Sequence, residues 1–421
     1  MEMLQEMPRK GVVYNYGYAS HFKTEYISVD FFLPLTKENA TGMSLLAGVL
    51  SRGCRKFPGM DRISRYLAKN YGASLSISAS KAGEMESLTF SFSFLDRKYA
   101  IDGEDIRAAA VELFRALVFD PLLEGDGFRA DYVEQEKKNL ADKIAGLFND
   151  KRVWALERCK GLMCAEEAFG IGENGDLETL EAFDPQSLYA FFQKVLKEAW
   201  VFAGYVGKDR AFSLESLLSD LSARETEMPQ TAVVPFGGKL KEIEEPMDLS
   251  QSKLTMGFRM GEAALENSAA ARLFNVLFGG SATSKLFMNV RERLSLCYYC
   301  SSRLYRMKNV MFVASGIQAD KYEQARSEIE RQLAAVAQGD FSEEELENAR
   351  IYLIDSYRSM NDNQSALSSL MLTGTLHNAL RTPEQEIEAM KGVSREEVIA
   401  VAKDVCLDTV YFLKGVHHEG E

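Results

Sequence analysis

Two kinds of hydrophobic pattern alternate in the first half of the chain. Leu88, Phe90, Phe92 and Phe94 are separated by single small polar residues, which is typical of a half-buried strand. By this criterion we expect strands at residues 12–35, 73–80, 88–94 and 200–206. Apolar residues spaced three or four apart predict helices at about 40–50, 61–70, 103–118, 128–147, the first part of 153–183, and 184–196.

The second half shows the same kinds of pattern after an interruption. Residues 222–240 contain two prolines and two glycines without a clear period, so we expect a linker there, with its centre at 226–240. Beyond it, strands are expected at 254–260, 296–301, 310–317 and 409–413. Helices are expected at about 267–278, 286–294, 319–337, 342–359, 362–380 and 394–405.

Several features of the two halves correspond in the same order. The matching positions are Glu38-Asn39 with Glu266-Asn267, Ile63 with Leu286, and Asp184 with Ser394. We therefore predict an α+β fold with two homologous domains related by internal duplication, each a mostly antiparallel sheet packed with helices. The predicted domains are residues 1–225 and 241–421, joined by the linker at 226–240.

The composition narrows the class of protein. An apolar fraction of 46% favours compact globular halves. The formal net charge of −13 argues against a nucleic-acid partner, because phosphate binding requires a basic patch. The first ten residues lack the apolar region of a signal peptide, and no window approaches the roughly 18 apolar residues of a membrane span. We therefore expect a cytoplasmic protein without a membrane association.

The cysteines do not suggest a disulfide framework. The six are Cys54, Cys159, Cys164, Cys297, Cys300 and Cys406. Cys297 and Cys300 form a C-x-x-C sequence, but positions i and i+3 of a regular strand point to opposite faces, so we do not expect them to bind a metal jointly. Buried free thiols are the simplest expectation for all six.

One segment, Phe278 to Tyr299, carries unusual polar residues. Gly279 and Gly280 permit a tight turn or a close approach of the backbone. A short helix is expected next, with Leu286, Val290 and Leu294 on its buried face, ending at Ser295 before a strand begins. Arg291 and Tyr298 stand at the end of this helix and the start of this strand. Taken alone, they are most simply a solvated arginine and a half-buried aromatic residue.

The same segment resembles the second-domain signature of the insulinase/pitrilysin family of zinc metallopeptidases, which includes the mitochondrial processing peptidase subunits. The matching residues are Gly279-Gly280, Ser284-Lys285-Leu286-Phe287, Val290-Arg291-Glu292 and Tyr298. Ser342-Glu343-Glu344-Glu345-Leu346 before a long helix is a further similarity. The resemblance extends over nearly the whole chain and implies the duplicated fold that the pattern also predicts.

Active members of this family carry the zinc motif H-x-x-E-H on the first helix of the first domain. Thr41-Gly42-Met43-Ser44 matches the residues that precede the motif, which places its three functional positions at Leu45, Gly48 and Val49. The third ligand, a glutamate on a later helix, aligns approximately with Lys143. The four histidines, at positions 21, 377, 417 and 418, contain no i, i+4 pair, so we expect this chain to bind no zinc and not to act as an independent peptidase.

The resemblance implies a role beside a second protein. In the family, the second-domain Arg and Tyr reach the substrate near zinc, which suggests that Arg291 and Tyr298 support the transition state and that Gly279, Gly280 and Ser281 contact substrate. Some members work as heterodimers of a zinc-bearing and a zinc-less chain. We therefore expect a zinc-bearing insulinase-like paralogue as partner, zinc in that partner, a peptide substrate, and a possible homodimer in isolation. The alternatives are a scaffold or assembly protein without proteolytic work and, less simply, a solitary hydrolase with a new metal site.

Overall fold

The computed structural model describes residues 1–101 and 103–416, which excludes His417 and His418. These residues form two compact units. The first comprises residues 1–145, 171–230 and 360–383, and the second comprises 146–170, 231–359 and, among the described residues, 384–416. One passage from the first to the second unit lies at Gln230–Thr231, inside the expected linker. Residues 146–170 join the second unit and 360–383 the first, whereas the sequence pattern suggested a single division at 226–240.

The first unit is built on a six-stranded sheet. In spatial order its strands are β1 (Glu2–Arg9), β2 (Val12–Tyr18), β8 (Trp200–Gly207), β3 (Thr24–Pro34), β5 (Met85–Leu95) and β4 (Ser74–Ala82). β2 and β8 are parallel, and the other neighbours are antiparallel. A small hairpin, β6 (Leu123–Glu124) and β7 (Gly127–Phe128), accompanies the sheet.

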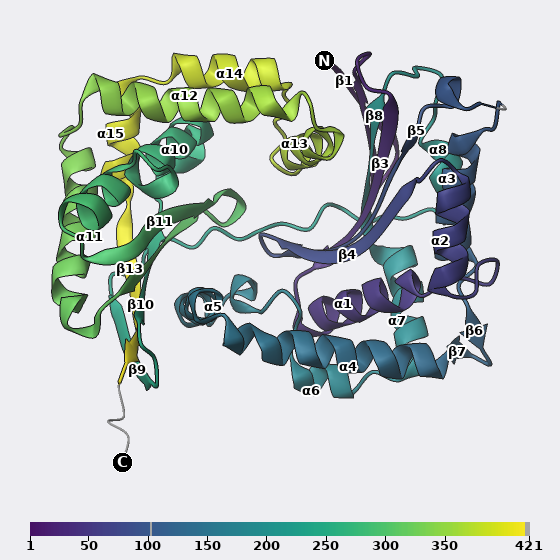
Figure 1. Cartoon of the computed structure of the whole chain (residues 1–421), viewed down its shortest axis with the longest axis horizontal. Helices are drawn as coiled ribbons and strands as arrows, with labels where there is room; N and C mark the ends of the chain where they lie inside the picture. Colours follow the sequence, from purple (N-terminus) through teal and green to yellow (C-terminus); the bar gives the residue numbers. More distant parts are fainter. Residues whose placement is uncertain (102, 417–421) are drawn as a thin grey trace. The chain divides into compact units, whose positions relative to one another are not determined.

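Helices cover both faces of this sheet (Figure 1). They are α1 (Lys37–Ser51), α2 (Met60–Lys69), α3 (Ile106–Phe119), α4 (Ala130–Gly146), α6 (Leu177–Glu181), α7 (Pro185–Glu198), α8 (Glu215–Leu218) and α13 (Gln364–Leu376). Ile27 and Phe31 belong to the large core that includes residues of α1, α3 and α7. Ser28 points to the other face, where its hydroxyl hydrogen-bonds to that of Ser368 on α13 at 2.9 Å. Successive side chains of β3 thus point alternately to the two layers of helices that cover the sheet.

The second unit contains a five-stranded sheet with the same topology. In spatial order its strands are β9 (Lys241–Met247), β13 (Cys406–Gly415), β10 (Ser252–Arg259), β12 (Val310–Ile317) and β11 (Cys297–Tyr305). β9 and β13 are parallel, and the remaining pairs are antiparallel. This order repeats β2, β8, β3, β5 and β4 strand by strand. The predicted α+β fold with duplicated, mostly antiparallel domains is confirmed, and β4 and β11 are equivalent edge strands.

The helices of the second unit repeat those of the first. They are α5 (Lys151–Met163), α9 (Glu262–Glu266), α10 (Ser268–Asn275), α11 (Tyr322–Ala337), α12 (Glu343–Met360), α14 (Pro383–Gly392) and α15 (Arg395–Asp404). α5 packs on β10 and β13, as α13 packs on the equivalent strands β3 and β8. Each half of the sequence therefore supplies the unit built mainly from the other half with one helix.

Several elements were not expected from the pattern: the edge strands β1 and β9 and the short elements β6, β7, α8, α9 and α14. β1 and β9 are mostly exposed polar edge strands, so they lack the alternation that identifies half-buried strands. α14 is short and begins at Pro383, between the helices expected at 362–380 and 394–405. The strand region expected at residues 12–35 contains two strands, β2 and β3. Within the described residues, no helix is both long enough and apolar enough to cross a bilayer.

Candidate functional site

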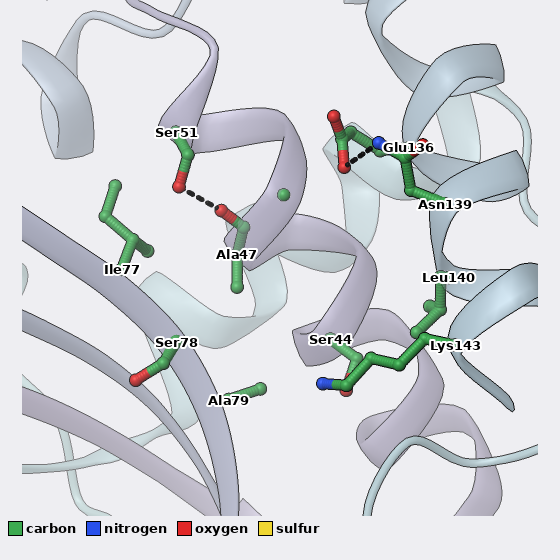
Figure 2. A pocket seen from close by; sticks show the side chains of 11 residues that line it. Ser44, Ala47, Ser51, Ile77, Ser78, Ala79, Glu136, Asn139, Leu140 and Lys143 are labelled. Atoms are coloured by element: carbon green, nitrogen blue, oxygen red, sulfur yellow. Dashed lines mark hydrogen bonds between the residues drawn. The ribbon is translucent and has the colours of Figure 1, made fainter. Parts of the chain in front are cut away.

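The first unit contains a cavity of about 270 Å³ between α1, α4 and the edge strand β4. Figure 2 shows it from close by, with α1 and α4 facing each other across it. The side chains and backbone that line it are Ser44, Ala47, Gly48, Ser51, Ile77, Ser78, Ala79, Glu136, Asn139, Leu140 and Lys143. This is the region where the resemblance places the degenerate zinc motif.

α1 presents a stripe of small residues to the cavity. Ser44, Ala47, Gly48 and Ser51 recur at helical spacing on that face. Leu45 and Val49, by contrast, belong to the hydrophobic core of the unit and do not line the cavity. Of the expected motif positions on α1, only Gly48 therefore reaches the cavity. Ser44, Ala47 and Gly48 face the cavity with the spacing i, i+3 and i+4 of the motif, each one residue before the position that the alignment gives it.

Glu136 of α4 fills the space in front of Gly48. A Cβ atom at position 48 would lie 2.6 Å from Oε2 of Glu136, so a side chain there would require Glu136 to move. The carboxylate is held in place, because Arg52 Nε donates to Oε1 at 2.6 Å. Asn139 Nδ2 also donates to Oε2 at 3.1 Å (Figure 2). Arg52 lies at the C-terminal end of α1, so the ion pair between its guanidinium and Glu136 links α1 to α4.

Lys143 also lines the cavity, and its ammonium extends from α4 toward Ser44 (Figure 2). A buried carboxyl lies nearby. Glu86 on β5 is 0% exposed, and neither of its side-chain oxygens has a hydrogen-bond partner among the described residues. Burial raises the pKa of Glu86 to about 9, the charge of Glu173 adds to this shift, and the ammonium groups of Lys81 and Lys143 oppose it.

The donor set of the cavity does not suit zinc. Catalytic zinc in proteins takes three ligands from imidazole, thiolate and carboxylate groups. Here the cavity offers hydroxyls and an amide, a carboxylate that Arg52 already pairs with, and the positive charge of Lys143. Within residues 1–101 and 103–416, no group of three or more His, Cys, Asp and Glu side chains is arranged to hold a metal ion.

The second candidate region lies in the second unit, around the glycines. Val276–Gly280 forms a π-helical turn, η4, that continues α10 and packs on β11. Gly279 is buried there, and a Cβ at this position would lie 2.7 Å from the Ser302 hydroxyl and 2.8 Å from its backbone nitrogen. Gly280 and Ser281 are half-buried, and the Ser281 hydroxyl donates to the carbonyl of Val276. The close packing on β11 thus accounts for Gly279.

The helix that follows is wider than expected. Phe287–Arg293 forms a second π-helical segment, η5, and Leu294 N–H donates to the carbonyl of Asn289, five residues earlier. The spacing of Leu286, Val290 and Leu294 predicts one buried face for a regular α-helix. The structure buries the first two but leaves Leu294 43% exposed, because the wider turn rotates it out of register. That part of the prediction is wrong. Ser295 ends the helix, as expected, with a positive φ of 50°.

Arg291 and Tyr298 are both on the surface of the second unit. The Arg291 guanidinium lies 4.6 Å from the centre of the Phe287 ring and 3.5 Å from the carboxylate of Glu292. Tyr298 is 65% exposed, which is unusual for a large aromatic side chain on a strand. Its exposure has a local cause. In the pairing of β11 with β12, Cys297 opposes Ile317 and Tyr299 opposes Gly316, so Tyr298 is the extra residue of a β-bulge.

The bulge overturns the expectation for the C-x-x-C sequence. Cys297 opposes Ile317 and Cys300 opposes Ser315, two positions that point to the same face of β12 because they are two residues apart. The extra residue therefore returns Cys297 to the face of Cys300, and each thiol shifts the pKa of the other. The prediction of opposite faces was wrong because it assumed a regular strand.

Several residues of these sites were absent from the sequence prediction. Ser44, Arg52, Glu86 and Glu136 are the clearest examples. The small residues at positions 44, 47, 48 and 51, set against apolar residues at 45 and 49, were a usable signal for the face of α1. No local pattern identified the bulge at Tyr298 or the burial of Glu86, which depend on pairing between distant strands.

Comparison with known proteins decides the family. The chain is 31% identical over 403 residues to the "Probable inactive metalloprotease YmfF" of Bacillus subtilis, covering 94% of this chain and 93% of the relative. The family model described as "Peptidase M16 inactive domain" matches residues 182–353. The chain belongs to the M16 peptidase family. This confirms the resemblance to the insulinase/pitrilysin metallopeptidases.

Other proteins are similar to the chain at lower identity. An "Uncharacterized zinc protease YmxG" of Bacillus subtilis is 22% identical over 55% of this chain and 57% of that protein. Among solved structures, a conserved protein from Enterococcus faecalis superposes with a TM-score of 0.91 at 27% identity, with complete coverage of both chains. A structure described as the peptidase M16 inactive domain from Pseudomonas fluorescens, at 16% identity and a TM-score of 0.79 over all of both chains, shows the shared M16 fold.

Proposed function

We propose that this chain is the non-catalytic subunit of a heterodimeric zinc metallopeptidase. In this proposal a zinc-bearing M16 paralogue supplies the metal and the hydrolytic water, and this chain supplies Arg291, Tyr298 and a surface for the peptide. The observation that carries the proposal is the bulge of β11, which presents the Tyr298 phenol to solvent while the cavity of the first unit has lost zinc-binding chemistry. The name of the Bacillus subtilis relative, a probable inactive metalloprotease, agrees with this division of labour.

The proposed role of Tyr298 follows from its chemistry and its exposure. A phenol O–H can donate a hydrogen bond to the oxyanion that forms when water attacks a peptide carbonyl. The bulge leaves this donor free of the sheet, and bulges commonly redirect side chains beside active sites. Arg291 would bind a peptide carbonyl with its planar group of N–H donors. Gly279, Gly280 and Ser281 would form a neighbouring surface, although Gly279 also has a packing role.

The first unit offers a place for an extended peptide. β4 is the last strand of its sheet, and within residues 1–101 and 103–416 it pairs with β5 alone. Its free edge can therefore accept a further strand through backbone hydrogen bonds. Ile77, Ser78 and Ala79 of β4 also line the cavity, so a peptide side chain can enter it directly from this edge. The small side chains of Ser78 and Ala79 leave room for peptide side chains of different kinds.

The proposal is tested by reconstitution. The chain carrying an affinity tag is co-expressed with a zinc-bearing M16 paralogue from the same genome, and the complex is sized by light scattering after gel filtration. We expect a 1:1 heterodimer that hydrolyses unstructured peptides, whereas this chain alone does not. Failure of the two chains to associate contradicts the proposal. Equal activity of the zinc-bearing chain without its partner also contradicts it and favours the scaffold role. A homodimer of the isolated chain is compatible with a surface adapted to a similar partner.

A further inference from the structure

Cys297 and Cys300 are brought together by the same bulge that exposes Tyr298. A regular strand would place them on opposite faces, but the pairing with Ile317 and Ser315 places them on one face as consecutive positions. Such positions are about 6.6 Å apart, two strand rises of about 3.3 Å. Disulfides form across Cα separations of roughly 4.4–6.8 Å. A disulfide also needs Cβ atoms about 3.5–4.5 Å apart, so a bond between these sulfurs requires the two positions to approach each other by about 2 Å, on a strand that lies at the edge of its sheet.

The two thiols differ in access. Cys297 is half-buried, so a small reagent can reach it, whereas Cys300 is 3% exposed and is shielded by its neighbours. This is the arrangement of an attacking thiol with a resolving thiol behind it. The four other cysteines lack this arrangement. Cys54, Cys159 and Cys164 are buried, and the Cys406 thiol donates to the carbonyl of Asp404.

The surroundings also favour the thiolate form of Cys297. The hydrogen bond from the Cys300 thiol holds the pKa of Cys297 below its ordinary value, and the positive charge of Arg291 acts in the same direction against the effect of burial. The same hydrogen bond and burial raise the pKa of Cys300 well above its ordinary value. One sulfur is thus prepared to attack, while the other keeps its proton until it is needed.

We propose that Cys297 and Cys300 form a peroxide-responsive dithiol, in which Cys297 is the site of oxidation and Cys300 resolves it. The Cys297 thiolate attacks one oxygen of hydrogen peroxide, the O–O bond breaks, and a sulfenic acid forms as hydroxide leaves. The Cys300 sulfur then attacks Cys297 Sγ, the S–O bond breaks, and water leaves with the proton of Cys300. The products are one intrachain disulfide and two waters from two thiols and one peroxide.

This inference does not depend on the proposed peptidase role, and its test uses the thiols alone. The reduced full-length chain is treated with a small excess of hydrogen peroxide, the remaining thiols are alkylated with iodoacetamide, and the peptides are mapped by mass spectrometry. We expect the peptide containing residues 297–300 to escape alkylation and to be lighter by two hydrogen atoms. Without peroxide, Cys297 should react with iodoacetamide at least about threefold faster than Cys406.

Variants separate the steps. In Cys300→Ser the sulfenic acid at Cys297 should persist and be trapped by dimedone, and in Cys297→Ser the same peptide should remain unoxidised. Cys406→Ser, which removes another half-buried thiol, should leave the reaction unchanged. Full alkylation of both Cys297 and Cys300 after peroxide overturns the proposal. A disulfide between two chains, or equal oxidation of Cys297 and Cys406, overturns it as well.

Discussion

Gly48 on α1 and Glu136 on α4 are so close that a Cβ carbon at position 48 would lie 2.6 Å from Oε2 of Glu136. The family places a catalytic glutamate at the position that aligns with Gly48. In this chain that space belongs to a carboxylate from the facing helix, which pairs with Arg52 at 2.6 Å. The missing side chain and the inter-helix ion pair are therefore parts of one arrangement.

This arrangement predicts that Gly48→Ala destabilises the chain. Alanine is favoured over glycine within a helix by about 1 kcal/mol, but here the methyl group must displace Glu136 from Arg52 and Asn139. We expect a net loss of about 1–2 kcal/mol in the free energy of unfolding, measured by urea denaturation.

Two further variants control this prediction. Gly146→Ala, at the end of α4 where a Cβ meets no atom within 4 Å, should be neutral or stabilising. In a Glu136→Ala background, Gly48→Ala should become neutral or stabilising too, because its obstacle has been removed. An unchanged cost in that background contradicts the assignment of the strain to Glu136.

Glu86 predicts a pH dependence of stability. Its pKa is about 9 in the folded chain against an ordinary value of 4.5, so the folded state holds a proton that the unfolded state releases. The contribution of this group is fully present below pH 4.5 and is lost as the pH rises toward 9. Glu86→Gln, which stays neutral throughout, should therefore stabilise the chain at pH 7 by on the order of 1–3 kcal/mol.

The measurement is the urea midpoint of both proteins between pH 5 and pH 8.5. The difference should grow with pH across this range and be smallest at pH 5. Glu124→Gln, which changes an exposed carboxylate in the same unit, should show no such trend. A difference that is independent of pH would mean that Glu86 is ionised in the folded chain.

The chemistry of the cavity predicts the metal content. Lys143 and the Arg52–Glu136 pair leave no free set of zinc ligands between α1 and α4. The chain purified from zinc-supplemented medium should contain far less than one zinc per molecule by plasma emission spectrometry. A zinc-bearing paralogue prepared in parallel should contain one. Stoichiometric zinc in this chain contradicts the assignment of metal chemistry to a partner.

Much of the fold could be predicted from local pattern. The alternation of Phe90, Phe92 and Phe94 defines the core face of β5, and all three are buried. Asp184 begins α7 with a capping box, and Ser394 begins α15 in the same way, which supports their correspondence. These features depend on neighbours in the sequence and on one buried face. The duplication could be predicted because both halves of the sequence contain these local features in the same order.

What the sequence did not reveal depends on partners far along the chain. β1 and β9 are strands because a neighbouring edge was available, although most of their residues are exposed and about half are polar. The bulge at Tyr298 exists only in the pairing of β11 with β12, and it reversed the expectation for Cys297 and Cys300. The unit to which α5 or α13 belongs is likewise decided by packing on strands that are distant in the sequence.

The most direct test of the central claim is the effect of Tyr298→Phe on the reconstituted complex. This change removes one hydroxyl from an exposed ring and leaves the bulge intact. If the phenol supports the oxyanion, kcat of the complex for an unstructured peptide should fall on the order of 10²-fold. The heterodimer should still form, and Tyr352→Phe, which alters another exposed tyrosine on α12, should have no effect. Full kcat in the Tyr298→Phe complex would contradict the claim that this chain lends a catalytic donor to its partner.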